Sequence, residues 1–410
     1  MKLIYAVLAA FVMVLGVGSA SATTEFVYYL NNGEVHELAS TDGKQWNDTQ
    51  VTAALTGTTS AMNDGNTLSF VTEGNGAKHI FFFNPSSYLM ELTNQNGAWQ
   101  PQLNVTAAAD APPAFNSTMT SYGDAWGQHV FYFSTSNDLI HLFTCPISPP
   151  APKANGKTCT PGTWQFTDLA ETHDAGSALS SFTDPDGDHV FYFSGGDLIH
   201  LLLTGTPRTT LQIVDLTKTA ISADGAEATI PHLTSFADTY GEHVFYTNGN
   251  LEHIYCSGGC SGQKLLALGT YLMGQSTSLL TSFSDAQGEH VYFLDPQSQL
   301  QEAFYDGTYW AFINLSTVGP QFGGIDFNSS LLSFTDSLGE HVFYIDGAKQ
   351  LNELTTVWKV IKTTVKPPYL PLVQIVPIRT NVVVHTTKGQ TIQLSTRFTL
   401  PSVLFTGFVQ

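Results

Sequence analysis

A unit of about 50 residues recurs along nearly the whole chain, and this repeat limits the possible folds more than any other feature. Its clearest copy spans residues 331–358 and reads LLSFTDSLGEHVFYIDGAKQLNELTTVW. Two runs rich in aromatic and β-branched residues flank a turn that contains Asp336 and Gly339, and a third run follows a second turn with a glycine. Each unit therefore predicts an antiparallel meander, the layout of one propeller blade.

A histidine opens the second predicted strand in six copies, and these marker histidines recur every 47 to 60 residues: His79, His129, His189, His243, His290 and His341. This spacing suits one four-stranded blade. A seventh copy begins near residue 25, where Phe26 replaces the histidine and the preceding strand is missing. The sequence thus predicts an all-β, seven-bladed propeller of four-stranded antiparallel blades. The repeats lie at about 25–58, 67–106, 118–170, 178–217, 232–270, 279–316 and 331–364.

Residues 1–22 have the pattern of a signal peptide, with Lys2, an apolar run and small residues at a cleavage site after Ala22. We therefore predict a single propeller domain over residues 23–410 in a secreted or periplasmic protein. No other run approaches the roughly 20 apolar residues that a membrane helix needs.

Beyond Trp358 the repeat ends. We predict an extension over residues 365–400, in which the proline-rich part 366–377 crosses the surface and residues 381–398 form a hairpin. The last segment, 401–410, resembles the first strand of a blade. Because an open ring would leave unpaired strand edges, we predict that this segment pairs beside residues 25–30 and closes the ring.

The charge of the chain disfavours two classes of partner. The formal net charge is −19, and only 12% of the residues are charged. Nucleic acids and anionic membranes require clustered lysine and arginine, which this chain lacks. The sequence specifies no oligomeric state.

The four cysteines suggest two disulfides in an exported protein. Cys145 with Cys159, and Cys256 with Cys260, each lie where the third strand of a blade turns into the fourth. No histidine or further cysteine stands at zinc-finger spacing near either pair, so no metal is expected there.

A second polar residue follows each marker histidine after 10 to 12 residues, in the third predicted strand: Glu91, His141, His200, His253, Glu302 and Glu353, with Glu37 in the first copy. At this interval we expect the two residues to lie directly opposite each other on one face of the hairpin. Such pairs can satisfy each other in the interfaces between blades, or they can form solvent-facing sites for a small polar ligand. We expect no catalytic or metal role and no cofactor, because the pairs repeat on different blades instead of converging.

A tryptophan marks the start of the predicted fourth strand in five copies: Trp46, Trp99, Trp164, Trp310 and Trp358. These side chains either fill the space between blades or offer a face to a sugar. The aspartates that open the turns before the marker histidines are expected to be turn residues and not calcium ligands: Asp124, Asp184, Asp238, Asp285 and Asp336.

The repeat SFxDxxGEHVFY, followed by LxEL and a tryptophan, resembles the propeller lectins that bind fucose, which include seven-bladed bacterial and six-bladed fungal members. In the fungal lectins an arginine that opens the second strand and a glutamate in the third strand hold the sugar beside an aromatic wall. Glu37, Glu91, Glu302 and Glu353 match that acid. The arginine position holds histidine or phenylalanine instead: His79, His290, His341 and Phe26.

The resemblance implies a non-catalytic protein that binds neutral saccharides, including fucosylated glycans, at several weak sites between blades. We predict that His79, Glu91 and Trp99 form one set, and that His290, Glu302 and Trp310 form another. Further candidates are Glu37, Trp46, His341, Glu353 and Trp358. Two alternatives remain open at this point, a secreted propeller glycosidase or sialidase and a propeller that binds another protein.

Overall fold

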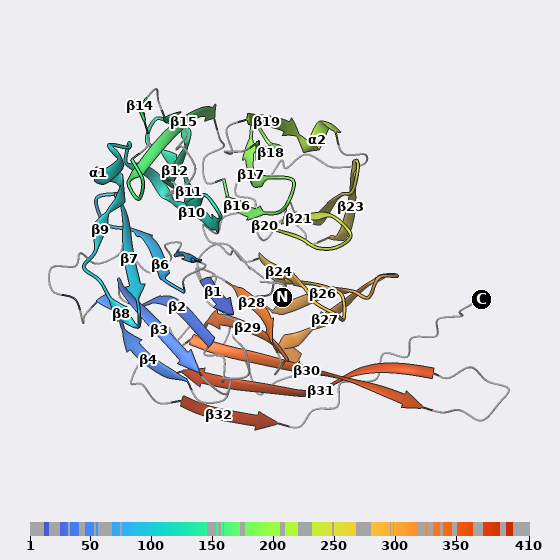
Figure 1. Cartoon of the computed structure of the whole chain (residues 1–410). Helices are drawn as coiled ribbons and strands as arrows, with labels where there is room; N and C mark the ends of the chain where they lie inside the picture. Colours follow the sequence, from blue (N-terminus) through green and yellow to red (C-terminus); the bar gives the residue numbers. More distant parts are fainter. Residues whose placement is uncertain are drawn as a thin grey trace.

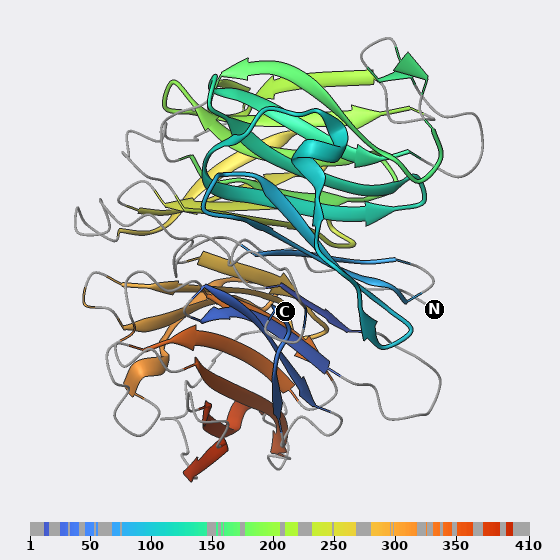
Figure 2. The same cartoon turned by 90° about the vertical axis from the view of Figure 1, so that its left-hand side faces the viewer.

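In the computed structural model, most of the described residues form β-strands, which are arranged around a ring (Figures 1 and 2). The structure describes residues 12–15, 25–31, 33–40, 46–52, 55, 68–73, 76–145, 153–154, 157–158, 160–172, 177–205, 210–219, 232–247, 250–267, 280–295, 297, 299–317, 325, 331–336, 339–346, 351–363, 372–385 and 391–396. No helix among them is long and apolar enough to cross a membrane.

Seven antiparallel sheets form the seven blades, which confirms the predicted fold class. Blades 1 to 3 contain the following strands: β1 Val12–Leu15, β2 Glu25–Asn31, β3 Glu34–Ser40 and β4 Asn47–Gln50; β5 Ser69–Thr72, β6 Lys78–Phe83, β7 Leu89–Gln95, β8 Ala98–Trp99 and β9 Leu103–Asn104; β10 Ala114–Asp124, β11 Gly127–Ser134, β12 Asp138–Thr144 and β15 Trp164–Thr172. A separate small hairpin joins β13 Lys153–Ala154 to β14 Lys157–Thr158.

Blades 4 to 7 continue the pattern: β16 Ser180–Thr183, β17 Asp188–Ser194, β18 Asp197–Thr204 and β19 Thr210–Asp215; β20 Leu233–Ala237, β21 Glu242–Thr247, β22 Asn250–Cys256 and β23 Cys260–Ala267; β24 Leu280–Ser284, β25 Glu289–Leu294, β26 Leu300–Tyr305 and β27 Trp310–Asn314; β28 Leu332–Asp336, β29 Gly339–Ile345, β30 Leu351–Thr363, β31 Leu372–His385 and β32 Thr391–Thr396. The helical segments are single turns after the fourth strands of blades 2, 4 and 6: α1 Val105–Ala109, α2 Leu216–Thr219 and η3 Leu315–Thr317.

The glycine of each turn before a marker histidine has a steric reason. Gly288 has φ +155°, and a Cβ atom there would lie 1.9 Å from the carbonyl oxygen of Tyr305. The turn residue Asp285 accepts hydrogen bonds from the backbone N–H groups of Gln287 and Gly288. The same pattern recurs at Asp124, Asp184 and Asp238, as expected for turn residues.

Strand β1 occupies the innermost position of blade 1, beside β2, with Val14 opposite Phe26. It also contacts β5 of blade 2 and β28 of blade 7, so the seven innermost strands form a closed circle. In the full-length chain β1 thus takes the place that we predicted for residues 401–410, which lie outside the described residues. The physical reason is chain proximity, because β1 precedes β2 by only a short connection and a short loop costs less entropy to close. Cleavage after Ala22 would vacate this place, so the pairing of residues 401–410 in a mature protein stays a prediction.

The hydrophobic core consists of seven clusters, one at each interface between neighbouring blades. Alternating side chains of a strand point to opposite faces of its blade, so each blade contributes to two clusters. At the closing interface, Val27 and Trp46 of blade 1 pack with Leu332 and Phe343 of blade 7. The ring is therefore closed by side-chain packing as well as by β1.

Hydroxyl groups link the innermost strands of blades 2 to 7. One of these hydrogen bonds joins Thr120 of β10 to Ser181 of β16 at 2.7 Å, and both side chains are buried. Four more connect the other neighbouring blades: Ser69 with Ser121, Ser180 with Ser235, Thr234 with Ser282, and Thr281 with Ser333. These hydroxyl groups thus join each of blades 3 to 6 to both neighbours.

Replacing Ser181 with alanine is expected to lower the free energy of unfolding by about 1–2 kcal/mol, because the buried hydroxyl of Thr120 loses its partner. Urea denaturation of the purified variant measures the change. Ser136→Ala, in an exposed turn of the same region, is the control and should match the wild type. Equal stability of the two variants would contradict the role of the hydroxyl chain.

Blade 7 differs from the sequence prediction in two ways. Residues 372–377, predicted as part of a surface excursion, belong to β31, which pairs with β30 along its whole length. Trp358, predicted at the start of a fourth strand, lies inside β30 opposite Pro377, next to a register shift. The long β30–β31 pair extends beyond the ring (Figure 1), and β32 pairs with β31 in the predicted hairpin region.

One predicted disulfide is present between Cys256, at the end of β22, and Cys260, at the start of β23. It joins the third and fourth strands of blade 5, as predicted. Cys145 is also disulfide-bonded. Its predicted partner Cys159 lies outside the described residues.

Candidate functional site

The marker histidine and the acid of the third strand meet inside the interfaces between blades. The Nδ1 atom of His79 lies 2.7 Å from Glu91 Oε1, and His290 and His341 make the same contact with Glu302 and Glu353, at 2.8 and 2.7 Å. All six side chains are buried. The predicted pairs are therefore real contacts, and in this structure they face the neighbouring blade and not solvent.

The members of a pair lie diagonally and not directly opposite each other. His79 is opposite Thr93, whereas Glu91 is opposite Phe81. The five-residue loop between β6 and β7 sets this register, so an interval of 12 residues produces a diagonal neighbour on the same face. This corrects the predicted register but keeps the two side chains on one face.

The tryptophan that meets an acid comes from the next blade around the ring. Trp164 donates its indole N–H to Glu91 at 3.1 Å, and Trp46 donates to Glu353 at 2.9 Å. Trp99 instead packs edge-on against Tyr28 of blade 1. A blade therefore presents its histidine and acid on one face and its tryptophan on the other.

The two predicted three-residue sets are accordingly divided by the fold. Trp310 lies edge-on to His253 of blade 5 and stacks on Tyr305 of its own blade. For Trp358 only the backbone is described. Glu37 accepts a hydrogen bond from Tyr28 at 2.6 Å and lies 3.6 Å from Lys78.

Sequence reasoning missed one member of each interface, the residue that directly precedes the marker histidine. Because side chains alternate along a strand, this residue points back toward the preceding blade. Glu242 reaches His189, Glu289 reaches His243, and Glu340 reaches His290. The alternation in GEHVFY was the signal that could have revealed it.

The chemistry of this third residue depends on its neighbours. Glu242 and Glu289 face blades whose third strand carries a histidine, His200 or His253. Two blades whose third strand carries a glutamate instead receive a hydrogen-bond donor: Gln128 lies 3.2 Å from His79, and Lys78 lies beside Glu37. Blade 6 differs, because its third strand carries Glu302 and the incoming residue is the acid Glu340.

Turn aspartates orient several of the marker histidines. His189 Nε2 lies 3.1 Å from Asp184 Oδ1, and the same contact occurs between His129 and Asp124, His243 and Asp238, and His290 and Asp285. Burial disfavours the charge on His189, but hydrogen bonds to Asp184 and Glu242 raise its pKa to about 9. These aspartates therefore serve the interface as well as the turn.

The interface between blades 6 and 7 concentrates buried charge. Glu340 is buried beside Glu302 and accepts a hydrogen bond from Tyr292 at 3.0 Å. Burial, together with the negative charges of Glu302 and Asp285, raises the pKa of Glu340 against the opposing effect of His290. Buried charged and polar groups of both blades therefore meet at this interface.

A groove of about 800 Å³ opens between blades 5 and 6. Its rim carries Tyr240 and Tyr309, which are 74% and 40% exposed. Trp310 forms one wall, and Gln263 and Asp306 supply polar groups. His243, His253 and Glu289 also line the groove. A smaller pocket of about 490 Å³ lies between blades 1 and 2, where Lys78 stands over the ring of Phe26.

No protein-family model matches the chain. No curated protein matches it in sequence. Among solved structures, the SapL1 lectin in complex with alpha methyl fucoside is 12% identical, with a TM-score of 0.44 over 74% of this chain and 96% of that one. AofleA from Arthrobotrys oligospora is 13% identical, with a TM-score of 0.46 over 75% and 86%.

Two further solved structures are similar to a comparable degree. The fungal lectin from Aleuria aurantia, described as a six-bladed propeller with a novel fucose recognition mode, is 11% identical, with a TM-score of 0.42 over 70% of this chain and 90% of that one. A putative 6-phosphogluconolactonase from Bacteroides uniformis is 10% identical, with a TM-score of 0.48 over 85% and 92%.

Proposed function

We propose that this protein is a secreted, non-catalytic propeller that binds neutral saccharides, and that its principal site is the groove between blades 5 and 6. The observation that carries the proposal is the groove itself, which combines exposed aromatic faces with amide and carboxylate groups. Aromatic rings pack against the C–H face of a sugar, while amides and carboxylates hydrogen-bond to its hydroxyl groups.

The charge of the groove favours a neutral ligand. Its lining residues include the acids Asp238, Asp285, Glu289 and Asp306 and no lysine or arginine. An acidic sugar would meet repulsion there, because the acids outnumber the one histidine that carries a charge, His243, which is already paired with Asp238 and Glu289. The pocket between blades 1 and 2, lined by Phe26, Glu37 and Asn94, is a candidate second site. Two weak sites on one chain would increase the avidity for clustered glycans, including fucosylated ones.

Titration with a panel of neutral saccharides, including fucosides, tests the proposal by calorimetry. Tyr309→Ala is expected to weaken binding about 10-fold, because it removes a stacking face worth about 1.4 kcal/mol. Tyr88→Ala is a matched control, since Tyr88 on blade 2 is also 40% exposed, and it should bind as the wild type does. Equal affinities for both variants, or hydrolysis of glycosides by the purified protein, would contradict the proposal.

Direct sugar contacts by the buried His–Glu pairs stay a prediction. Glu91→Gln belongs in the same titration, because Glu91 is buried beside His79 and Trp164. If the groove is the principal site, this substitution leaves the affinity unchanged. A loss as large as that of Tyr309→Ala would place the sugar at the His–Glu pairs instead.

Secretion is tested by the N-terminus of the protein recovered from the culture medium. Sequencing is expected to begin at Thr23, after the predicted cleavage site. Cleavage there would remove β1 from blade 1, so the same measurement decides whether β1 belongs to the mature ring. Retention of the protein in the cytosol with Met1 intact would contradict the proposal.

A further inference from the structure

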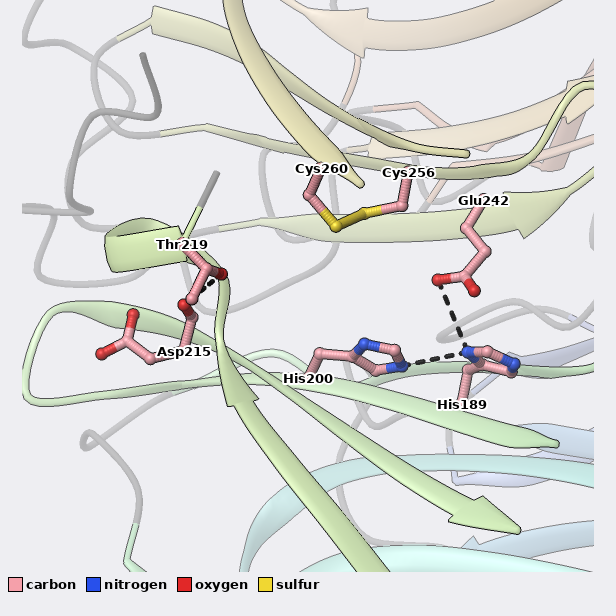
Figure 3. The surroundings of a disulfide bond; sticks show 7 residues. All are labelled: His189, His200, Asp215, Thr219, Glu242, Cys256 and Cys260. Atoms are coloured by element: carbon pink, nitrogen blue, oxygen red, sulfur yellow. Dashed lines mark hydrogen bonds and ion pairs between the residues drawn. A yellow bond between two sulfur atoms is a disulfide. The ribbon is translucent and has the colours of Figure 1, made fainter. Parts of the chain in front are cut away.

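Blades 4 and 5 share a cluster of two histidines and a glutamate (Figure 3). His189 comes from β17, His200 from β18 and Glu242 from β21 of the next blade. His189 Nδ1 lies 3.0 Å from His200 Nε2 and 3.5 Å from Glu242 Oε2. The three possible ligand atoms, one from each side chain, lie within 4.8 Å of one another.

The same cluster recurs one interface further along the ring. His243 Nδ1 lies 3.1 Å from His253 Nε2 and 3.2 Å from Glu289 Oε2. Glu289 is 6% exposed, and its Oε2 atom is fully buried without a hydrogen-bond partner of acceptable geometry. The Oε2 atom of Glu289 therefore lies within reach of an ion bound beside the two ring nitrogens.

We propose that each of these two clusters binds one divalent transition-metal ion, of which zinc is the representative, through two imidazole nitrogens and one carboxylate oxygen. Two histidines and one glutamate form a known zinc ligand set that keeps a fourth position open. A tetrahedral ion with bonds of about 2.0–2.1 Å separates its ligand atoms by roughly 3.3 Å. The observed separations from His189 and His243 lie between 3.0 and 3.5 Å.

The tautomer of the marker histidine suits a metal ligand. Asp184 Oδ1 lies 3.1 Å from His189 Nε2, and Asp238 Oδ1 lies 3.3 Å from His243 Nε2. His189 Nε2 donates a hydrogen bond to Asp184, so Nδ1 is the nitrogen that faces the cluster, and the Nδ1 atom of His243 faces the second cluster in the same way. Metal-binding histidines commonly donate their second N–H to a carboxylate in this way, which fixes the ring and strengthens the ligand.

The second histidine of each cluster turns one ring nitrogen toward the first. His200 Nε2 and His253 Nε2 lie 3.0 and 3.1 Å from the Nδ1 atoms of His189 and His243. A metal ion bound by both nitrogens would take the place of the proton that they share in its absence, so binding releases protons.

The types of ligand atom favour one class of metal ion, and both clusters can be reached from solvent. Calcium and magnesium require oxygen ligands, whereas these clusters offer mainly nitrogen. The groove between blades 5 and 6 reaches His243, His253 and Glu289. The side chain of Glu242 is 20% exposed, which opens the other cluster to solvent.

Two other interfaces serve as internal controls. Between blades 3 and 4, His129 Nδ1 lies 2.9 Å from His141, but the incoming acid is Asp188, one methylene shorter, which groups with Asp124 and His129 and not with the histidine pair. Between blades 2 and 3, Glu91 replaces the second histidine and accepts from Trp164. Neither interface brings two histidines and an acid together.

The experiment uses tag-free protein that has been treated with EDTA and then dialysed. Zinc is titrated by calorimetry, and the bound metal is measured by mass spectrometry. We expect two zinc ions per chain and a rise in Tm of a few degrees at saturating zinc. Calcium should produce neither. Failure of the wild type to bind zinc would overturn the inference, whatever the outcome of the saccharide titration, on which it does not depend.

Substitutions assign the two ions to the two clusters. His200→Gln and His253→Gln should each reduce the stoichiometry from two to one, and the double variant should bind none. His141→Gln, at the interface without a suitable acid, should keep both ions. Retention of two ions by the double variant would contradict the assignment.

Cobalt provides a second measurement on the unaltered protein, in case a variant fails to fold. Cobalt(II) bound to the clusters should give the strong visible absorption of four-coordinate cobalt, and zinc should displace it. The pale spectrum of six-coordinate cobalt would overturn the proposed ligand set.

Discussion

Lowering the pH from about 6.5 to about 4 is expected to destabilise the propeller by several kcal/mol. Burial lowers the pKa of His232 to about 4, and burial together with the charge of a neighbouring histidine lowers the pKa values of His200 and His253 to about 4 and about 3. The unfolded chain takes up these protons near pH 6.5, whereas the folded chain does not. Each group therefore contributes up to about 3–5 kcal/mol that is present above pH 6.5 and is lost as the pH falls through the folded pKa.

Stability is also expected to fall on the alkaline side. Burial opposes the charge on His189 and His243, but their aspartate and glutamate partners raise both pKa values to about 9. These protonated side chains stabilise the folded protein fully below pH 6.5, and this contribution is lost as the pH rises through about 9. The stability maximum should therefore lie near pH 6.5.

Calorimetric Tm values measured from pH 4 to pH 10 test both the acid and the alkaline loss of stability. The measurements are made in EDTA, since the chelator removes any contribution from metal. His253→Gln should reduce the fall in Tm between pH 6.5 and pH 4, because one buried neutral histidine is removed. A Tm that stays constant between pH 6.5 and pH 4 would show that the buried histidines do not control stability.

Replacing Glu353 with alanine is expected to lower the free energy of unfolding by about 3–5 kcal/mol. The buried carboxylate accepts hydrogen bonds from Trp46 of blade 1 at 2.9 Å and from Thr355 at 3.1 Å, and it lies 2.7 Å from His341 Nδ1. Alanine removes this shared acceptor and leaves a cavity at the interface that closes the ring. Chemical denaturation followed by tryptophan fluorescence measures the loss.

Two further variants separate burial from charge. Glu353→Gln keeps the shape and one acceptor oxygen, so its loss should be smaller than that of alanine. Lys218→Ala removes an exposed ion pair with Asp197 and Asp215 and should leave the denaturation midpoint close to that of the wild type, because exposed pairs contribute little. A Glu353→Ala variant as stable as Lys218→Ala would mean that packing alone closes the ring.

The repeat could be interpreted from the sequence because a blade is a local structure. Each signal is contained in one repeat of at most 60 residues. These signals are the alternation of HVFY, the turn from Asp285 to Gly288, and the distance from one marker histidine to the next. Strand order and blade number follow from such short-range signals. The same locality predicted the disulfide between Cys256 and Cys260.

The ends of the ring could not be predicted in this way. Whether β1 or residues 401–410 lie beside β2 depends on which segment reaches that edge first, and both segments are apolar and compatible with a strand. Only the whole fold places β1 there. The length of β30, and with it the position of Trp358, likewise depends on its pairing with β31.

The sequence by itself determined the blades and the pairing of each marker histidine with its third-strand partner, because a hairpin register is set within one repeat. Only the tertiary structure decided what those pairs face. Glu242 and Glu289 reach the histidines of the preceding blade, Trp164 reaches Glu91, and the groove forms where blades 5 and 6 meet. A blade has two faces, and the residues that complete each polar cluster belong to a neighbour about 50 positions away, so their meeting depends on the packing of blades around the ring.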